Sequence, residues 1–584
     1  MNTEEEFEAT PESNLTEGTP SVTFESITFS DGTTIHLDPA DVVVLVGPNN
    51  SGKSLALREL DNHFGRNPAT TVLKSANLRK FGEPEGFDAF VREHGKVRGE
   101  GGERTISGYQ FSVNFAGRNL RDYWPDDITP FRSLFFLRVP TEKRITDSDP
   151  VPSINNLEQH ATNPIHMLWD DELESKISGY FRRAFEEDLI LYRGGVMRPP
   201  LLVGERPAPQ DGEDRVSSNY LQRLIDSTVP LNEQGDGMRS FASVILHLLA
   251  PITPTVMILD EPEAFLHPPQ ARLLGEIIAN ERSSDAQLFV ATHSSDVLHG
   301  LINVASDRLR VLRVHREGNV NRVKELDKDL VREISVDPLM KYSSVMAGVF
   351  HERVIICESD ADCMFYSSIL DLPGVRGEAQ PDVLFVHASG KGRIAALAKT
   401  LVALGVPVDV ITDIDILRDT SDFKSIVEAL DQDSTVVSGL AEAVKSAIEH
   451  HKPWLNAAET KKGILETLED TPASGEFPQK QRSEIESLFR KASPWDAVKS
   501  SGESAIPSGG ATQQFQRLLT LCKAMGLWIV PAGELEGFCK SVGGHGPRWV
   551  QQVIEDRDLA KDQELERARV FVRDIWASRD ERAT

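Results

Sequence analysis

Short apolar runs, each followed by polar residues, recur along this chain and set its predicted architecture. In the first half, such runs cover 42–46, 256–259 and 288–292. Short runs without polar alternation are typical of strands that a parallel sheet buries on both faces. Because a helical pattern follows the run 42–46 and further helical stretches lie between the others, we expect an α/β domain.

The pattern returns in the second half. Apolar runs at 353–357, 383–388 and 408–412 alternate with helical stretches, which predicts βαβ units and a Rossmann-like parallel sheet. A helix-rich insertion with two loose stretches that bear Pro, Gly and Ser interrupts this sheet over about 417–525. A last strand and a charged amphipathic helix are expected after it.

These patterns divide the chain into a tail and two domains. Residues 1–20 are acidic and are expected to be disordered. We assign 21–334 to the first domain, whose middle, about 69–230, is the least informative part of the sequence, and 335–584 to the second. Within that middle part, the two stretches that read YQFSVNF and LFFLRVP are expected to form a pair of strands. The predicted fold class is α/β.

Composition narrows the class of protein. The chain is 40% hydrophobic and 26% charged, and it lacks the apolar run of ~18 to 20 residues that a membrane span needs, so no membrane partner is expected. Its start has no signal-peptide pattern, which predicts the cytoplasm. The cysteines form no C-x-x-C pair, which argues against a zinc site. The net charge of −27 opposes phosphate binding, but a local basic surface is enough to hold nucleic acid.

A predicted phosphate-binding loop follows the first apolar run. Residues 47–54 read GPNNSGKS and fit G-x-x-x-x-G-K-[ST] between a strand and a helix. In such a loop, Gly47 and Gly52 let backbone N–H groups surround the phosphates. Lys53 reaches the β and γ oxygens, and Ser54 gives its hydroxyl to Mg²⁺. We therefore expect ATP here, and the other loop residues expected at the nucleotide are Asn49, Asn50 and Ser51.

Two carboxylates stand at the end of the run 256–259. Asp260 is placed to hold the Mg²⁺ of the nucleotide, and Glu261, one residue further out, is placed to polarise the attacking water. His293 follows the run 288–292, where its imidazole could reach a γ-phosphate. A buried strand that ends in a charged turn would give the same local pattern, but the phosphate loop upstream favours an ATPase.

A glycine-bearing turn, GDGMRS at 235–240, opens a long apolar helix shortly before these carboxylates. Helix N-termini at such turns bind anions, so we expect Gly237 and Ser240 to contribute to nucleotide binding. Two other residues stay open. Arg144 is either a nucleotide-facing arginine or a solvated one, and Gln110 either senses Mg²⁺ or lies on a surface strand.

Acidic residues also follow the strands of the second sheet. Glu358 and Asp362 come after the first strand, and Asp413 and Asp415 come after the third. Because the carboxyl ends of parallel strands meet at one sheet edge, these acids can converge although they are far apart in sequence. Carboxylates without histidine or thiol partners suit Mg²⁺ or Mn²⁺. We therefore expect a metal site, and solvated strand ends are the alternative.

These motifs resemble two known modules. The phosphate loop, the D-E pair with the trailing P-E-A-F-L-H-P, and T-H-S are similar to the ABC-like ATPase heads of the structural-maintenance and recombination-repair proteins, although GDGMRS stands where those heads have L-S-G-G. E-x-x-x-D followed by D-x-D is similar to the Toprim fold. Their order resembles the overcoming-lysogenization-defect (OLD) family of nucleases, whose relatives include the nuclease subunit of the Gabija antiphage system. The resemblance covers most of 22–538.

The resemblance implies further residues and partners. It implies that Glu534 and Glu536 complete a second metal shell, with helix-cap glutamates as the alternative, and that Lys540 stabilises charge at the scissile phosphate. It implies that Gly237 and Ser240 contact the nucleotide of a second subunit, so that the protein is at least a homodimer. It also implies antiphage defence, with a partner helicase or another defence subunit.

The function that these expectations support is a metal-dependent DNA endonuclease in which nucleotide state gates phosphodiester hydrolysis. The expected catalytic residues are Glu261, His293, Glu358, Asp413, Asp415 and Lys540. An RNA-cleaving toxin, for example one that cuts transfer RNA, would share this chemistry. A non-nucleolytic ABC-type ATPase of DNA repair is a third hypothesis, and the intact set of acids argues against it.

Overall fold

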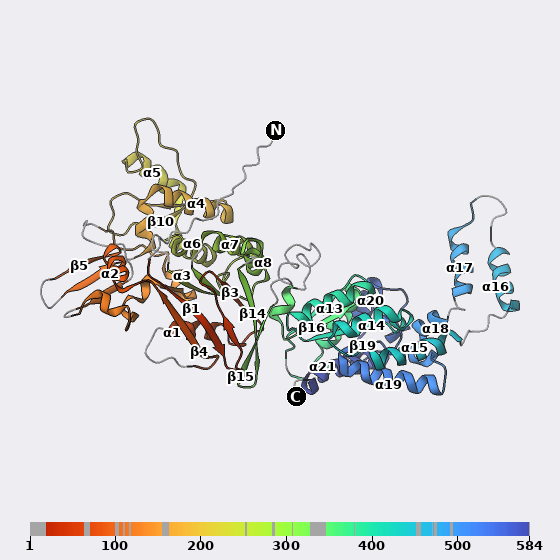
Figure 1. Cartoon of the computed structure of the whole chain (residues 1–584). Helices are drawn as coiled ribbons and strands as arrows, with labels where there is room; N and C mark the ends of the chain where they lie inside the picture. Colours follow the sequence, from red (N-terminus) through yellow and green to blue (C-terminus); the bar gives the residue numbers. More distant parts are fainter. Residues whose placement is uncertain are drawn as a thin grey trace. The chain divides into compact units, whose positions relative to one another are not determined.

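The chain forms two compact units, Met1–Phe350 and His351–Thr584 (Figure 1). The second unit therefore begins later than the expected 335. Across the described ranges, no helix combines the length and the apolar character needed to cross a bilayer. This computed structural model describes residues 19–63, 70–99, 104–108, 111–115, 118–154, 163–250, 254–282, 286–305, 308–326, 346–378, 380–450, 457–469, 471, 476–490 and 494–582.

A six-stranded sheet forms the centre of the first unit, in the order β15-β14-β3-β13-β12-β8. The edge strand β15 pairs antiparallel with β14, and the other neighbours are parallel. All residues of β3 and β13 are buried, as the uninterrupted apolar runs predict. The strands are β3 (Val42–Val46), β8 (Phe136–Val139), β12 (Val256–Asp260), β13 (Gln287–Ala291), β14 (Leu309–Glu317) and β15 (Val320–Glu325).

The position of β8 corrects one expectation. β8 does not pair with β7 (Phe111–Asn114), which joins β5 (Gly95–Arg98) and β6 (Thr105–Gly108) in a separate sheet. Instead it extends the main sheet beside β12. Its apolar side chains Phe136 and Val139 are buried there, so burial against the main core outweighs local pairing.

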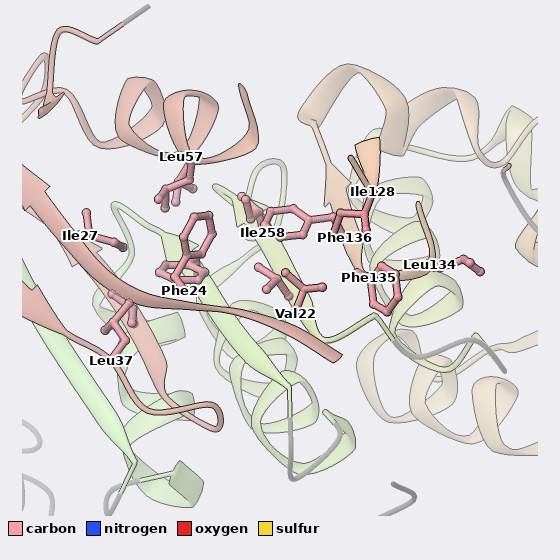
Figure 2. Close-up of a cluster of buried hydrophobic side chains, with 14 of the residues drawn as sticks. Val22, Phe24, Ile27, Leu37, Leu57, Ile128, Leu134, Phe135, Phe136 and Ile258 are labelled. Atoms are coloured by element: carbon pink, nitrogen blue, oxygen red, sulfur yellow. The ribbon is translucent and has the colours of Figure 1, made fainter. Parts of the chain in front are cut away.

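A second layer covers the main sheet near the phosphate loop. The antiparallel sheet β2-β1-β4 and α1 share one apolar core with β8 and β12, as Figure 2 shows for Val22, Leu57 and Ile258. The ring of Phe24 meets the ring of Phe136 edge-on, with centroids 5.6 Å apart. The elements are β1 (Ser21–Phe29), β2 (Thr34–His36), α1 (Lys53–Asn62) and β4 (Leu73–Phe81).

Other helices of the first unit connect the strands of the main sheet. Two further helices, α4 and α5, pack against the small antiparallel sheet β11-β10-β9 and form a second group with it. The helices used below are α3 (Thr141–Thr146), α6 (Asp236–Leu248), α7 (Pro268–Glu281) and α8 (Ser295–Ala305). The second group comprises α4 (Asp171–Phe185), β9 (Asp188–Leu191), β10 (Leu201–Gly204), α5 (Ser218–Ser227) and β11 (Thr228–Pro230).

The second unit is built on a parallel four-stranded sheet in the order β17-β16-β18-β19. Its apolar face packs against helices near the end of the chain, through residues such as Phe365, Trp528 and Phe571. The strands and covering helices are β16 (Arg353–Cys357), α11 (Asp360–Leu370), β17 (Val383–His387), α13 (Ile394–Ala403), β18 (Val408–Thr412), β19 (Leu527–Ile529), α20 (Pro547–Asp556) and α21 (Glu566–Arg582).

Between β18 and β19 the chain leaves the sheet for a series of helices. These occupy the region of the expected helical insertion at 417–525, and β19 returns to pair with β18. The insertion contains α14 (Thr420–Ala429), α15 (Thr435–His450), α16 (Ala457–Glu469), α17 (Gln479–Arg490), α18 (Pro494–Ser501) and α19 (Gly510–Met525).

Candidate functional site

The loop between β3 and α1 surrounds the side chain of Lys53. Its Nζ donates hydrogen bonds to the carbonyl oxygens of Gly47, at 2.7 Å, and Pro48, at 2.8 Å. Burial lowers the pKa of Lys53 to about 8, although the carboxylates after β12 act in the opposite direction. Asn49 and Asn50 are exposed at the tip of the loop. The ammonium group therefore lies at the centre of the loop, where phosphate oxygens are expected.

Both glycines of the loop motif are required by close packing. Gly47 and Gly52 have φ values of +141° and +99°, and a Cβ on Gly47 would lie 2.1 Å from the carbonyl oxygen of Val314. A Cβ on Gly52 would lie 2.7 Å from the side-chain nitrogen of Asn321, and that nitrogen donates to the carbonyl oxygen of Ser51. The β14–β15 hairpin thus holds one side of the loop, a contact that the loop motif alone does not reveal.

The carboxylates at the end of β12 meet the loop and the end of β13. Ser54 Oγ donates to Asp260 Oδ1 at 2.8 Å, and His293 Nε2 lies 3.3 Å from Glu261 Oε1. Burial and the nearby charge of Lys53 lower the pKa of His293 to about 4. Its imidazole is therefore neutral at pH 7. The structure thus brings together five residues that the sequence predicted at the nucleotide.

Glu263 is a residue of this site that the sequence reading missed. Its Oε1 accepts hydrogen bonds from Thr292 Oγ1, at 2.7 Å, and from the backbone N–H of His293, at 2.9 Å. Burial raises the pKa of Glu263. The carboxylate fixes the backbone that carries His293. Its signal in the sequence is the glutamate of the P-E-A-F-L-H-P stretch that follows Glu261, to which no role was assigned.

Arg144 is neither nucleotide-facing nor solvated. Its side chain is fully buried, and its guanidinium donates to the carbonyl oxygens of Asp260, at 2.8 Å, and Glu261, at 2.7 Å. Arg144 therefore holds the backbone of the two carboxylates. The other open residue, Gln110, lies outside the described residues.

The turn at 235–240 begins α6, and its residues differ in exposure. Gly235 and Asp236 are exposed, whereas a Cβ on Gly237 would lie 2.6 Å from the carbonyl oxygen of Phe265. Ser240 is fully buried. The expectation that Ser240 contacts a nucleotide is therefore corrected, because α6 directs this side chain into the core. Gly237 stays a prediction.

Carboxylates from two strand ends meet at the edge of the sheet in the second unit. Glu358, Asp413 and Asp415 each place one carboxylate oxygen within 4.8 Å of the others. Glu358 Oε1 also accepts a hydrogen bond from the backbone N–H of Asp413 at 2.9 Å. Ligand oxygens lie about 2.1 Å from Mg²⁺, so opposite ligands lie about 4.2 Å apart. The oxygen-only donor set and its spacing fit Mg²⁺ or Mn²⁺ after small side-chain movements.

A second group of ligand atoms lies in the loop after β19. Glu534, Glu536 and His545 also place ligand atoms within 4.8 Å of one another, and Glu536 accepts a hydrogen bond from the backbone N–H of Gly546 at 2.7 Å. The two glutamates expected from the family resemblance thus lie together. His545 was not expected, because it follows a glycine-rich stretch that matches no metal-binding spacing.

Two lysines lie among these acids. Lys499 Nζ, from α18, is 3.5 Å from Asp413 Oδ2, 3.5 Å from Asp415 Oδ2 and 3.6 Å from Glu534 Oε2. Lys391 Nζ pairs with Asp415 and lies 3.9 Å from Glu358 Oε2. The two cations offset part of the negative charge, and Lys499 connects the two groups of acids.

Lys499 rather than Lys540 lies among these acids, and the role of Lys540 at a phosphate stays a prediction. Lys540 is exposed just after the loop acids, and among the described ion pairs the lysines at the acids are Lys391 and Lys499. A Cβ on Gly533 would lie 2.1 Å from the carbonyl oxygen of Lys499. This close approach seats α18 against the loop that carries Glu534. The sequence could not reveal it, because Lys499 belongs to a helix of the insertion and to no motif.

Burial and mutual repulsion disfavour the charged state of the acids. Burial, followed by the charge of Asp413, raises the pKa of Glu358, and burial is also the main cause of the raised pKa of Asp413. The pKa values of Asp362 and Glu534 are raised for the same first reason. A divalent cation would relieve this accumulation of negative charge.

Comparisons with known proteins place these two sites in two known domain families. Residues 42–298 match the family described as "AAA domain, putative AbiEii toxin, Type IV TA system". Residues 349–415 match "Overcoming lysogenization defect protein-like, TOPRIM domain". The chain is therefore a fusion of an ATPase domain and a Toprim domain. This order of domains supports the resemblance to the OLD nucleases.

One curated relative and several solved structures share parts of this chain. The Old nuclease of Escherichia phage P2 is 24% identical over 214 residues, which is 35% of either chain, so the match spans about a third of that relative. An SMC head bound to the C-winged helix domain of ScpA is 12% identical with a TM-score of 0.33, covering 53% of this chain and 98% of the head. For the SMC head domain from Thermotoga maritima, the identity is 13%, the TM-score 0.28 and the coverage 53% and 99%.

Proposed function

We propose that the protein is a metal-dependent DNA endonuclease whose ATPase domain gates cutting through its nucleotide state. The observation that carries this proposal is the meeting of Glu358, Asp413 and Asp415 at one sheet edge, with a second acidic group beside them. Buried carboxylates with raised pKa values are expected at sites that hold cations. The match to an OLD-like Toprim domain over residues 349–415 supports the same reading.

The residues of the second unit have separable roles in this proposal. Glu358, Asp362, Asp413 and Asp415 would hold Mg²⁺ or Mn²⁺, and Glu534 and Glu536 would complete a second ligand shell. The bound ion would supply an activated water and a charge that stabilises the leaving oxygen of a phosphodiester. Lys499, at 3.5 Å from Asp413 Oδ2, is placed to bind the non-bridging phosphate oxygens.

The first unit would bind and hydrolyse ATP. Lys53 and the loop backbone would bind the β- and γ-phosphates, and Ser54 and Asp260, whose side chains are 2.8 Å apart, would hold Mg²⁺. Glu261 orients the attacking water and accepts its proton, while His293 keeps the Glu261 carboxylate in place through their 3.3 Å contact. Asn49 and Asn50 are exposed at the tip of the same loop, and Ser51 is buried within it.

The remaining parts of the proposal concern partners and setting. We propose that two copies form a homodimer around ATP, with Gly237 of one subunit at the nucleotide of the other. A role in antiphage defence, a cytoplasmic location and a partner helicase or other defence subunit follow from the family resemblance.

A cleavage assay tests the proposal. Purified protein is incubated with supercoiled plasmid DNA and with transfer RNA, with Mg²⁺ or with EDTA, and with or without ATP. We expect Mg²⁺-dependent cutting of the plasmid at a rate that ATP changes, with intact transfer RNA. Asp413→Ala should abolish cutting and leave ATP hydrolysis, whereas Lys53→Ala should weaken ATP binding. Cutting that survives in Asp413→Ala would refute the metal site.

An RNA-cleaving toxin is the second candidate. It is favoured by one observation, namely that the family matched by residues 42–298 is described with a toxin. The same assay separates the two functions, since cutting of transfer RNA with an intact plasmid would replace the DNA endonuclease by the toxin.

A further inference from the structure

A short segment of the first unit contacts both the backbone of Asp260 and Glu261, at the end of β12, and the turn that begins α6. The segment, residues 141–148, consists of α3 and the two residues that follow it. It leads directly from β8, the edge strand beside β12. The segment matches no sequence motif, but it makes two sets of contacts, one with the end of β12 and one with α6.

On one side the segment fixes the backbone of Glu261. Arg144 donates to the carbonyl oxygens of Asp260, at 2.8 Å, and Glu261, at 2.7 Å, while Thr141 Oγ1 accepts from the same guanidinium at 3.0 Å. Glu261 has a φ of +47°, a left-handed conformation that a residue with a side chain keeps only when its surroundings enforce it. Arg144 is therefore one of the contacts that hold the backbone from which the Glu261 carboxylate projects.

On the other side the segment holds α6 through Arg239. This arginine donates to the carbonyl oxygen of Ile145, at 2.9 Å, and to Ser148 Oγ, at 2.8 Å. One turn or more further along α6, Ser243 Oγ and His247 Nε2 both lie 2.8 Å from an oxygen of the buried Asp147. Four residues of the segment thus make hydrogen bonds outside it. Arg144 bonds to the end of β12, and Ile145, Asp147 and Ser148 bond to α6.

The turn also touches the loop after β12 directly. A Cβ on Gly237 would lie 2.6 Å from the carbonyl oxygen of Phe265, a residue with a φ of +73°. The turn therefore meets the loop that carries the carboxylates at two places, through this close backbone approach and through the segment.

We propose that residues 141–148 couple the α6 turn to ATP hydrolysis, with Arg144 as a positioning residue for Glu261. This inference rests on the proposed ATPase function and adds a regulatory connection to it. An anion or a second copy that engages the turn moves 145–148, and Arg144 carries that movement to the Glu261 carbonyl. Hydrolysis is then fast only when the turn is engaged.

Arg144→Lys tests the positioning role. Lysine keeps the charge but cannot donate to two carbonyl oxygens from one rigid fork. We expect kcat for ATP to fall about 10- to 100-fold, while the Kd for ATP changes less than about twofold, because the loop contacts of Lys53 remain. A kcat near the wild-type value, or equal changes in kcat and Kd, would overturn the proposal. Arg282→Lys is the matched control, since Arg282 is buried and donates to the carbonyl oxygen of Ala286 at 3.2 Å, and its kcat should not change.

Arg239→Lys tests the coupling. Because the Arg239 side chain is 17% exposed and that of Arg144 is fully buried, this variant also provides a test if Arg144→Lys does not fold. We expect a lower kcat for this variant with an unchanged Kd. The double variant should be no slower than Arg144→Lys alone, since both changes interrupt one path. Additive losses, or a wild-type kcat in Arg239→Lys, would contradict the coupling.

Amide hydrogen exchange separates this inference from the proposed function. If the wild-type protein hydrolyses no ATP, the ATPase proposal fails. The coupling is then tested by the rate of amide hydrogen exchange at 235–240, measured with and without ATP. ATP should change this rate in the wild-type protein and leave it constant in Arg239→Lys. An identical change in both proteins would overturn the coupling.

Discussion

The side chain of Asp413 combines a cost in stability with its proposed role as a metal ligand. Burial raises its pKa to about 7, far above the value of about 3.9 in an unfolded chain. Between these two pH values the native carboxyl keeps a proton that the unfolded chain has lost. The free energy of unfolding of the metal-free protein therefore falls as pH rises through this window.

Asp413→Asn should remove this cost. We expect the variant, without metal, to melt at least about 2 °C above the wild-type protein at pH 7.5, and the difference to disappear near pH 4, where both proteins carry a neutral side chain. Melting curves at the two pH values, in the presence of EDTA, measure it. A variant that is less stable at pH 7.5 would show that the charged carboxylate contributes stability in the absence of metal.

Lys499 and Lys540 offer a matched pair of substitutions in the second unit. Lys499 lies among the acids, whereas Lys540 is exposed. Lys499→Ala should slow DNA cutting by about 100-fold or more, since removal of one donor to a developing charge typically has this effect. Lys540→Ala should cut at the wild-type rate. Initial rates of cutting of supercoiled plasmid compare the two variants. A slower rate for Lys540→Ala than for Lys499→Ala would show that Lys540, and not Lys499, acts at the site.

At the scale of elements, the strands and the ends that carry polar residues are largely predictable from the sequence. The runs that became β3, β12, β13, β16 and β18 are short and almost entirely apolar, and the acids that follow them need no long-range information. Chain connectivity alone, however, does not determine which edge β8 joins. Nor does it reveal that a helix of the insertion returns Lys499 to the sheet edge, because both depend on tertiary packing between distant segments.

The turn that begins α6 is a second place where the sequence does not reveal the direction of a side chain. The sequence predicts an anion-binding helix start at 235–240, but the inward direction of Ser240 follows from the register of α6 against its neighbours. Arg144 is similar, since an arginine after a strand gives no signal that its partners are the carbonyl oxygens of Asp260 and Glu261.

Gly237→Ala should disturb this contact between elements. The new Cβ would meet the carbonyl oxygen of Phe265 at 2.6 Å, whereas Gly235 has nothing within 4 Å of the same position. We expect Gly237→Ala to lower the free energy of unfolding by about 1 to 3 kcal/mol, which is the usual cost of an overpacked site. Urea unfolding measures this cost, and Gly235→Ala is the control. Equal stability of the two variants would show that the turn yields freely to the loop.

At the scale of the whole molecule, the proposal joins a nucleotide site in one unit to an acidic site in the other. The two sites share no residue, and each is built within its own compact unit. A dimer that closes around ATP would give nucleotide state a route to the acidic site.

Glu261→Gln should stabilise that dimer. The amide keeps the size of the side chain but cannot accept the proton of the attacking water, so ATP is bound and not consumed. With ATP and Mg²⁺ we expect the variant to sediment as a dimer or larger, and to return to its smaller form without nucleotide. Analytical ultracentrifugation reports this directly, with Lys53→Ala as the control. The same sedimentation coefficient with and without ATP would show that the nucleotide does not drive dimerisation.

The most direct test of the central claim is the binding of Mn²⁺ to the second unit of the full-length protein. Electron paramagnetic resonance of the free ion, measured during a titration without nucleotide, counts the ions that the protein removes from solution. We expect the wild-type protein to bind one or two Mn²⁺ ions, and Asp413→Ala to lose at least one of them. Equal binding by the two proteins would show that Glu358, Asp413 and Asp415 do not hold a shared cation.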